Sequence, residues 1–296
     1  MALDDERTGV ILTTVGARPV IAAKKGATVE LGIQGKRAFV SGSSSGIGKA
    51  IALELAREGC AVVVHGRDAT RAEETAHEIE AMGATAVVSL GDLATDEGCE
   101  TVAETALAAL GVVDIVVNNA GVALLKDNPV WSEIPPQTWL DSYQINLMSA
   151  LRMSLHFLPG IKESGWGRFI NISTRSATTT PTMTEYGAAK AALNKLTADM
   201  AKDVGRYGAT ANAIAPGVIR TAAIEEWIAI QSKEIGCSPE EYERKYLSEI
   251  LPQAVPHFGR PEDIAHMAAF LASRNAGYIS GAVIRVCGGS ATNVYL

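Results

Sequence analysis

Tyr186 and Lys190 are the residues of this 296-residue chain whose types and spacing most directly suggest chemistry. They lie four positions apart in a stretch with helical periodicity, so the phenol and the ammonium project from one helix face. A free tyrosine has a pKa of roughly 10 and exchanges protons poorly near neutrality. A nearby cation lowers that pKa, which would suit the tyrosine to general acid–base catalysis. Alone, such a pair is more often a surface contact, so its meaning depends on the neighbouring motifs.

A glycine-rich loop runs from Ser41 to Gly48 and reads Ser-Gly-Ser-Ser-Ser-Gly-Ile-Gly. It follows a short apolar run and enters a helical pattern, where glycines let backbone N–H groups approach a pyrophosphate at the helix start. The alternative is a turn without a ligand, because the spacing differs from the Gly-x-Gly-x-x-Gly of many dinucleotide enzymes. The residues expected to contact a cofactor here are Gly42, Ser44, Ser45, Gly46, Ile47 and Gly48.

The second apolar run ends in His65-Gly66-Arg67-Asp68. An acid at this point usually binds the ribose hydroxyls of NAD, whereas an arginine suits the 2′-phosphate of NADP. We assign Arg67 to the 2′-phosphate and Asp68 to the cap of a helix over 69–82. NADP(H) is therefore favoured over NAD(H), the alternative being that Arg67 is an ordinary surface charge.

Short runs that are apolar on both faces alternate with longer helical patterns from about residue 35 onward. This is the pattern of parallel strands covered by helices on both sides. It predicts an α/β fold of the Rossmann-like, doubly wound type, with a mostly parallel sheet in a single domain over 35–296. The expected strands are Ala38–Ser41, Ala61–His65, Ala86–Leu90, Ile115–Asn118, Phe169–Ser173 and Thr210–Ile214.

Residues 1–34 fall outside this pattern and are taken as an N-terminal extension of unknown role. Short strands at Val10–Thr14, Val20–Ala23 and Thr28–Leu31 are one interpretation. An ordered arm or a loose tail are the others, because single-sequence patterns do not separate them.

Five motifs follow one another along residues 35–296. They are the loop at 41–48, Asn-Asn-Ala-Gly at 118–121, Ser173, Tyr-Gly-Ala-Ala-Lys at 186–190 and Pro-Gly-Val-Ile-Arg-Thr at 216–221. Tyr186 lies 13 residues after Ser173, which lies 27 residues after Asn146. In these motifs, their order and their spacing the chain resembles the short-chain dehydrogenase/reductase family. It departs from the family pattern at Cys287, where an aspartate is common, and at Ser41, which replaces the usual threonine.

The resemblance implies a role for each residue of the site. Tyr186 would be the general acid for ketone reduction and the base for alcohol oxidation, and Lys190 would lower its pKa and bind the nicotinamide ribose. Ser173 would polarise the substrate oxygen, and Asn146 would hold a water that relays protons. Further cofactor contacts are implied for Asp92, Leu93, Asn119, Ala120, Gly121, Tyr186, Lys190, Pro216, Gly217, Ile219 and Thr221.

A segment at about 221–258 predicts two helices, which in this family would form the substrate lid. The first is expected at 222–234, and the second starts at Ser238 with a capping box. From 222 to 251, seven acidic side chains stand against three basic ones, a net charge of -4. Such a lid would repel an acidic acyl carrier, so we expect a free, fairly apolar ketone or secondary alcohol as substrate. Apolar lid residues either wall the pocket or only pack the lid: Trp227, Ile228, Ile235, Tyr242, Tyr246 and Leu247.

Composition narrows the remaining classes. The net charge of -7 and the absence of a dense basic stripe argue against nucleic-acid binding. No run of 18 apolar residues is present, the N-terminus resembles no targeting segment, and the four separate cysteines and five histidines lack metal spacing. We therefore expect a cytoplasmic protein without a metal or a membrane partner, and the family implies a homotetramer or homodimer.

The leading hypothesis is an NADP(H)-dependent carbonyl reductase or alcohol dehydrogenase. A 3-oxoacyl thioester reductase, acting on acyl-carrier-protein or CoA substrates, is the nearest alternative. A nucleotide-sensing regulatory module is the non-enzymatic alternative, which the retained Tyr186 and Lys190 disfavour.

Overall fold

A computed structural model of the protein describes residues 12–15, 18–21, 29–125, 130–179 and 183–290. The chain forms two compact units, Met1–Glu30 and Leu31–Leu296. The first contains β1 (Leu12–Val15) and β2 (Arg18–Ile21), which pair antiparallel. Of the third strand expected near this end, at 28–31, the described residues 29–31 are not in a strand.

The second unit begins at Leu31, four residues before the start suggested by the sequence. The reason is packing upstream of the first sheet strand. Ile33 is fully buried in the core, and the carbonyl of Leu31 accepts a hydrogen bond from the Arg274 N–H at 3.0 Å. The residues just before the sheet therefore belong to the larger unit.

Seven parallel strands form the sheet of the larger unit. Their order is β5-β4-β3-β6-β7-β8-β9, which confirms the doubly wound, Rossmann-like prediction. The strand order reverses between β3 and β6, and in such sheets the crevice beyond the carboxyl ends of these two strands receives the ligand. The strands are β3 (Arg37–Val40), β4 (Ala61–Gly66), β5 (Ala86–Leu90), β6 (Ile115–Asn118), β7 (Gly167–Ile172), β8 (Ala209–Pro216) and β9 (Val283–Val286).

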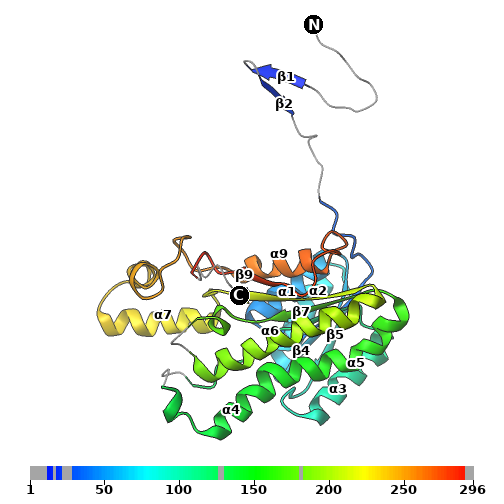
Figure 1. Ribbon diagram of the computed structural model, residues 1–296, viewed down its shortest axis with the longest axis horizontal. Coiled ribbons are helices and arrows are strands. Elements are labelled where there is room, and N and C mark those ends of the chain that lie inside the picture. The colour runs from blue at the N-terminus through cyan, green and yellow to red at the C-terminus, as the bar shows by residue number, and fades with distance from the viewer. Residues whose placement is uncertain (1–11, 16–17, 22–28, 126–129, 180–182, 291–296) are drawn as a thin grey trace. The chain divides into compact units, whose positions relative to one another are not determined.

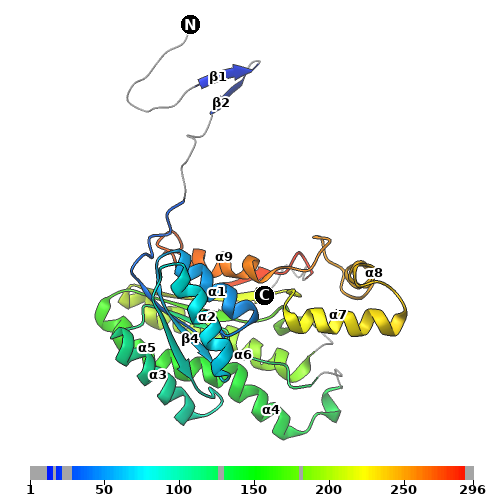
Figure 2. The same cartoon turned by 180° about the vertical axis from the view of Figure 1, so that it is seen from behind.

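Helices cover both faces of the sheet (Figures 1 and 2). On one face Ile51, Ile79 and Ile264 enter one hydrophobic core, and on the other Val102 and Phe157 enter a second. The first face carries α1 (Gly46–Arg57), α2 (Ala69–Ala81) and α9 (Pro261–Ala272). The second carries α3 (Asp96–Leu110), α5 (Ser149–Ser164) and α6 (Thr184–Val204).

Shorter elements complete the unit around the carboxyl ends of the strands. A short π-helix, η2 (Gln144–Met148), joins α4 (Pro136–Tyr143) to α5, and short π-helical segments of this kind are frequent at functional sites. The two helices of the predicted lid, a segment called the lid below, are α7 (Ala222–Ile235) and α8 (Pro239–Lys245), followed by η5 (Tyr246–Ile250). The remaining short turns are η1 (Trp131–Glu133), η3 (Arg175–Ala177) and η4 (Gly205–Tyr207).

Within the described residues, no helix is both long enough and apolar enough to cross a bilayer. Location in the cytoplasm stays a prediction.

Candidate active site

The glycine-rich loop joins β3 to α1 at the switch point of the sheet. Gly42 and Gly46 have positive φ angles of 64° and 55°, which favour glycine. A side chain at Gly48 would lie 2.3 Å from the Gly42 carbonyl oxygen, so the backbone folds back on itself. Helix α1 starts at Gly46, and Ser45 makes no side-chain cap bond to it. The first-turn N–H groups of α1 are thus suited to an anion such as a pyrophosphate.

Ser41 and Asn119 tie this loop to the end of β6. The Ser41 Oγ accepts the N–H groups of Asn119 and Ala120 at 2.8 and 2.9 Å. The Asn119 side chain donates to the carbonyls of Ser41 and Gly42 at 2.9 and 3.2 Å. Ser41, in place of the usual threonine, therefore still supplies the hydroxyl that accepts these N–H groups. The Asn119 side chain shapes the loop, so a contact with the cofactor would fall to its backbone.

His65, at the end of β4, was missed as a residue that positions the loop. Its ring is buried, and Nδ1 accepts the Gly42 N–H at 2.9 Å. Nδ1 must then be unprotonated, so Nε2 carries the proton, 3.1 Å from the Gly91 carbonyl oxygen. Burial lowers the pKa of His65 to about 4. A histidine ending an otherwise apolar strand was the available signal.

The neutral state of His65 predicts an acid-sensitive stability. Between the folded pKa of about 4 and the ordinary 6.5, the unfolded chain binds a proton that the native chain does not. This residue's contribution, about 3 kcal/mol, is present above pH 6.5 and lost as the pH falls to 4. Urea unfolding at pH 7 and 4.5 should show a smaller loss for His65→Asn, whose amide oxygen can still accept the Gly42 N–H. The exposed His77→Asn is the control, and equal losses in His65→Asn and the unmodified chain would contradict the assignment.

Arg67 follows β4 beside the loop and has no ion pair among the described residues. Gly66 leaves no room for a side chain, because its Cβ would lie 2.8 Å from the Ser44 Oγ. Asp68 caps α2, as predicted, by accepting the Arg71 N–H at 3.1 Å, and its other oxygen pairs with the Arg71 guanidinium. Its carboxylate is therefore committed to the cap, while Arg67 and Ser44 stay available.

Several residues expected at a cofactor have side chains turned into the protein. Leu93 packs in the core beside Cys99, and Ile219 is also buried in the core. Ile47 packs partly against the same core as Ile219. Asp92 is exposed after β5, and its carboxylate accepts the Ala94 N–H at 3.1 Å. At Leu93, Ile219 and Ile47 the backbone is thus the part best placed to meet a ligand. The exposed carboxylate of Asp92 can still reach one.

The turn after β8 passes close to the phosphate loop. Pro216 is the last residue of β8, and a Cβ on Gly217 would lie 2.8 Å from the Cys287 Cα. Thr221, at the far end of this turn, lies against the phosphate loop, because its methyl would be 3.4 Å from a Cβ on Gly46. The sheet edge, the turn and the loop therefore enclose one region.

The hydroxyls of Ser173 and Tyr186 are uncommitted. Ser173 follows β7, where its N–H donates to the Ile214 carbonyl at 2.7 Å. Its Oγ is buried and has no hydrogen-bond partner among the described residues. Tyr186, near the start of α6, likewise has no side-chain hydrogen bond to the described part of the chain. A buried hydroxyl without a partner is costly, so a bound oxygen is the natural partner of Ser173.

Lys190 lies one turn after Tyr186 in the same helix, α6. Its Nζ is 5.8 Å from the centre of the Tyr186 ring and donates to the Ile172 carbonyl at 2.8 Å. Burial lowers the pKa of Lys190 to about 7 and raises the pKa of Tyr186 to about 12. Burial disfavours the charged form of both groups, and the lowering of the tyrosine pKa by Lys190 stays a prediction. A protonated phenol remains suited to acting as an acid.

Asn146 lies in η2 and is joined to the segment after β6. Its amide nitrogen donates to the carbonyls of Val122 and Ser142 at 2.9 and 3.0 Å, and its Oδ1 accepts the Val122 N–H at 2.9 Å. Gly121 permits this approach, because its Cβ would lie 2.6 Å from the Asn146 Oδ1 and 2.9 Å from the Lys190 Nζ. Both amide hydrogens are used within the chain. The predicted water-holding role thus requires an oxygen of Asn146, and it stays a prediction.

The short chain dehydrogenase family matches residues 36–231, more than half of the chain. The protein belongs to this family.

Individual relatives differ in what they act on. This short chain dehydrogenase is 37% identical to the 3-oxoacyl-[acyl-carrier-protein] reductase FabG of Pseudomonas aeruginosa, over 88% of this chain and 98% of that protein. It is 33% identical to the 7alpha-hydroxysteroid dehydrogenase of Escherichia coli, over 88% and 95%. A crystal structure of L-sorbose reductase from Gluconobacter frateurii, complexed with NADPH and L-sorbose, superimposes with a TM-score of 0.85 at 30% identity. That likeness covers 90% of this chain and all of the other.

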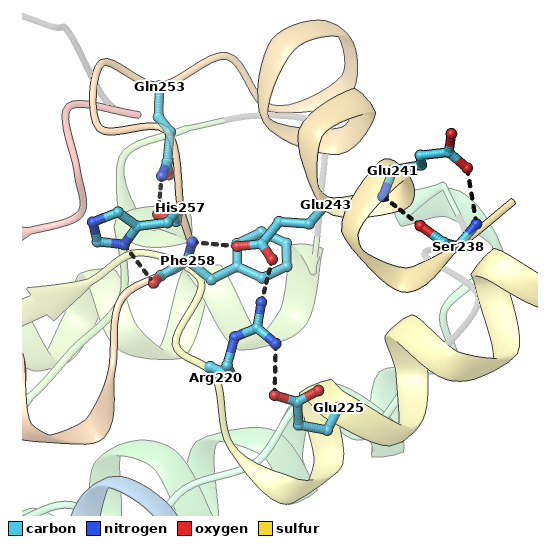
Figure 3. Close-up of polar contacts among 8 residues, drawn as sticks. All are labelled: Arg220, Glu225, Ser238, Glu241, Glu243, Gln253, His257 and Phe258. Carbon is cyan, nitrogen blue, oxygen red and sulfur yellow. Dashed lines mark hydrogen bonds and ion pairs between the residues drawn. The ribbon is translucent and has the colours of Figure 1, made fainter.

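The lid of this short chain dehydrogenase is held to the turn after β8 by Arg220 (Figure 3). The guanidinium pairs with Glu225 of α7 at 2.8 Å and with Glu243 of α8. The other oxygen of Glu243 accepts the Phe258 N–H at 2.8 Å, which reaches the segment before α9. The predicted capping box of α8 is present, with Ser238 and Glu241 bonded reciprocally. One arginine thus connects both lid helices to the site.

Most apolar lid residues pack against one another. Ile228, Tyr242 and Leu247 are buried in a cluster of their own with Phe258. Trp227 meets Tyr242 edge-on at 5.4 Å, and Ile235 is half exposed. The packing interpretation therefore holds for most of them. Tyr246 packs partly against this cluster and also lies within electrostatic range of Arg175, on the loop after β7.

Proposed function

We propose that the protein interconverts a ketone and a secondary alcohol with NADP(H), using Tyr186 as general acid in reduction and general base in oxidation. The observation that supports this most directly is the pair of uncommitted hydroxyls, Ser173 and Tyr186, next to the buried Lys190. Two hydroxyls without partners provide the two contacts that one substrate oxygen needs.

Each side chain has one task in the reduction. A bound nicotinamide would supply the hydride to the carbonyl carbon. Ser173 holds the carbonyl oxygen through its Oγ, and Tyr186 transfers the phenolic proton to that oxygen as the negative charge develops. Lys190, fixed on the Ile172 carbonyl, lies close enough to stabilise the phenolate that this transfer leaves. A phenol with a raised pKa is protonated at neutral pH, which favours the reductive direction.

The choice of NADP(H) rests on the end of β4. Arg67 is exposed and directly follows Gly66, which packs against Ser44, while Asp68 is committed to its cap. The sorbose reductase with the similar fold was crystallised with NADPH.

Reversal of the charge at Arg67 tests the cofactor assignment. In Arg67→Glu the KM for NADPH should rise roughly 30- to 100-fold, because a charge-assisted contact with the 2′-phosphate is replaced by repulsion. The KM for NADH should change less than threefold. Steady-state rates at 340 nm measure both, with the remote Arg206→Glu as the charge-matched control. Equal effects on the two cofactors would refute the assignment.

The substrate we propose is a free, fairly apolar ketone or secondary alcohol. The similarity to FabG keeps a carrier-bound 3-oxoacyl thioester as the second candidate. The exposed acids of the lid, among them Glu226, Glu234 and Glu249, oppose the approach of an acidic carrier. Turnover rates decide between the two candidates. They are measured with NADPH and with NADH on ketones, secondary alcohols and 3-oxoacyl thioesters, the thioesters both free and carrier-bound. Turnover of carrier-bound thioesters at rates equal to the free compounds would overturn the preference, and no turnover would favour a nucleotide-sensing module.

A homotetramer or homodimer is proposed from the family. Residues 193–200 of α6 and the C-terminal strand are proposed for the interfaces. Leu193 and Thr197 are buried within the chain itself, so the contacts of α6 would come from the other residues of that stretch.

A further inference from the structure

Arg175 stands two residues after Ser173, on the same loop. Ser173 is fixed by its bond to Ile214, and the next residue, Thr174, caps η3 by accepting the Ser176 N–H at 3.2 Å. The backbone of Arg175 is held as well, since its carbonyl accepts the Thr178 N–H at 3.1 Å. The base of this side chain is therefore positioned as firmly as the proposed substrate-binding hydroxyl.

The guanidinium of Arg175 lies within electrostatic range of groups from two other parts of the site. One is the phenol of Tyr246, at the start of η5 in the lid, and the other is the thiol of Cys287, directly after β9. Arg175 thus lies where the catalytic loop, the lid and the last strand meet.

Arg175 has no anionic partner in the described part of the chain. It is only partly exposed, and burial lowers its pKa, so water covers the guanidinium incompletely. No carboxylate or carbonyl among the described residues accepts from it. Arg168, the more deeply buried arginine, bonds to the carbonyls of Gly167 and Ser273 and stacks on Trp166. A partly buried cation is usually paired, so the missing partner of Arg175 is expected from outside the chain.

We propose that Arg175 binds the carboxylate of an oxo acid or hydroxy acid whose reacting oxygen lies at Ser173 and Tyr186. This rests on the proposed function for its reaction, and it replaces the fairly apolar substrate proposed there by a free ketone or alcohol that carries a carboxylate. The planar fork of a guanidinium matches the two oxygens of a carboxylate, and the Tyr246 ring beside it suits an apolar segment between the two polar ends. A phosphate ester presents similar oxygens, but its second charge is opposed by the net negative lid.

Paired substrates isolate the carboxylate contact. The probes are levulinate and methyl levulinate, acetoacetate and methyl acetoacetate, and dihydroxyacetone with its phosphate. In Arg175→Met, KM for the oxo acids should rise roughly 10- to 100-fold while KM for the esters changes less than threefold, since only the acids lose a charge-assisted contact. Arg175→Lys should recover part of the acid preference. Arg244→Met, an exposed cation of α8, is the control.

Binding measured without turnover separates this inference from the proposed function. Levulinate and acetoacetate are titrated calorimetrically into the enzyme with NADP⁺. The unmodified enzyme should bind at least one of the two acids, and Arg175→Met should bind neither. The inference is overturned if the ratio of KM for the acids to KM for the esters in Arg175→Met stays within threefold of the ratio in the unmodified protein. Continued turnover of ketones would leave the proposed function standing in that case. Dependence on Arg175 for the phosphate alone also overturns it. Loss of all turnover, with acid binding intact, instead removes the proposed reaction.

Discussion

Replacing Tyr186 by phenylalanine is expected to lower kcat for ketone reduction by roughly 10²- to 10⁴-fold, the usual contribution of a positioned proton donor. The substitution removes one hydroxyl, which has no hydrogen bond to the described part of the chain, and keeps the ring beside Lys190. Affinity for NADPH should therefore remain within about threefold, because the phosphate loop is untouched. Turnover is measured from NADPH absorbance, and affinity from the fluorescence of the bound cofactor.

The control for this variant is Tyr207→Phe. Tyr207 lies in η4, before β8, where its ring stacks with Arg206 and Lys162 away from the site. Its kcat should equal that of the unmodified protein. If Tyr186→Phe retained more than a tenth of the turnover, Tyr186 would not be the principal proton donor.

Lys190→Met should abolish most activity and at the same time stabilise the protein below about pH 7. Burial lowers the pKa of Lys190 from 10.5 to about 7, so between these values the unfolded chain binds a proton that the native chain does not. Stability therefore rises with pH across this window, and the full cost of the lysine is present at pH 7 and below. Methionine avoids that cost of several kcal/mol but leaves the Ile172 carbonyl unpaired, so a net gain of about 2 kcal/mol at pH 6 is expected.

Denaturant unfolding at pH 6 and pH 10 tests the sign of this effect. The advantage of Lys190→Met should shrink at pH 10, where the native lysine is neutral and most of its cost has gone. Lys202→Met, an exposed change in the same helix, should shift stability by less than about 0.5 kcal/mol at either pH. A variant less stable than the unmodified chain by the same amount at both pH values would contradict the buried, strained state of Lys190.

The strands were predictable from the sequence because burial on both faces leaves continuous apolar runs. Two of them, 86–90 and 115–118, end where the sequence places them, and β4 extends one residue beyond its predicted range. The caps at Asp68 and Ser238 were also predictable, since a cap depends on residues only three positions apart.

What sequence could not supply are contacts set by packing between distant segments. His65 reaches Gly42 because β3 and β4 pair in a particular register, with Val40 opposite Val64. The helix spacing places Lys190 near Tyr186 but says nothing of the burial that raises the pKa of Tyr186. The sequence likewise could not single out Arg175, because its lack of a partner among the described residues depends on where the neighbouring side chains lie.

Under the proposed function, the ion pairs of Arg220 predict that the affinities for cofactor and substrate depend on each other. It lies between Ile219 and Thr221 in the turn proposed to contact the nicotinamide, and it pairs with Glu225 and Glu243 of the two lid helices. A rearrangement of the turn on cofactor binding would therefore reach the two helices that are proposed to cover the substrate. By thermodynamic reciprocity, a cofactor that favours lid closure tightens substrate binding by the same factor as substrate tightens cofactor binding.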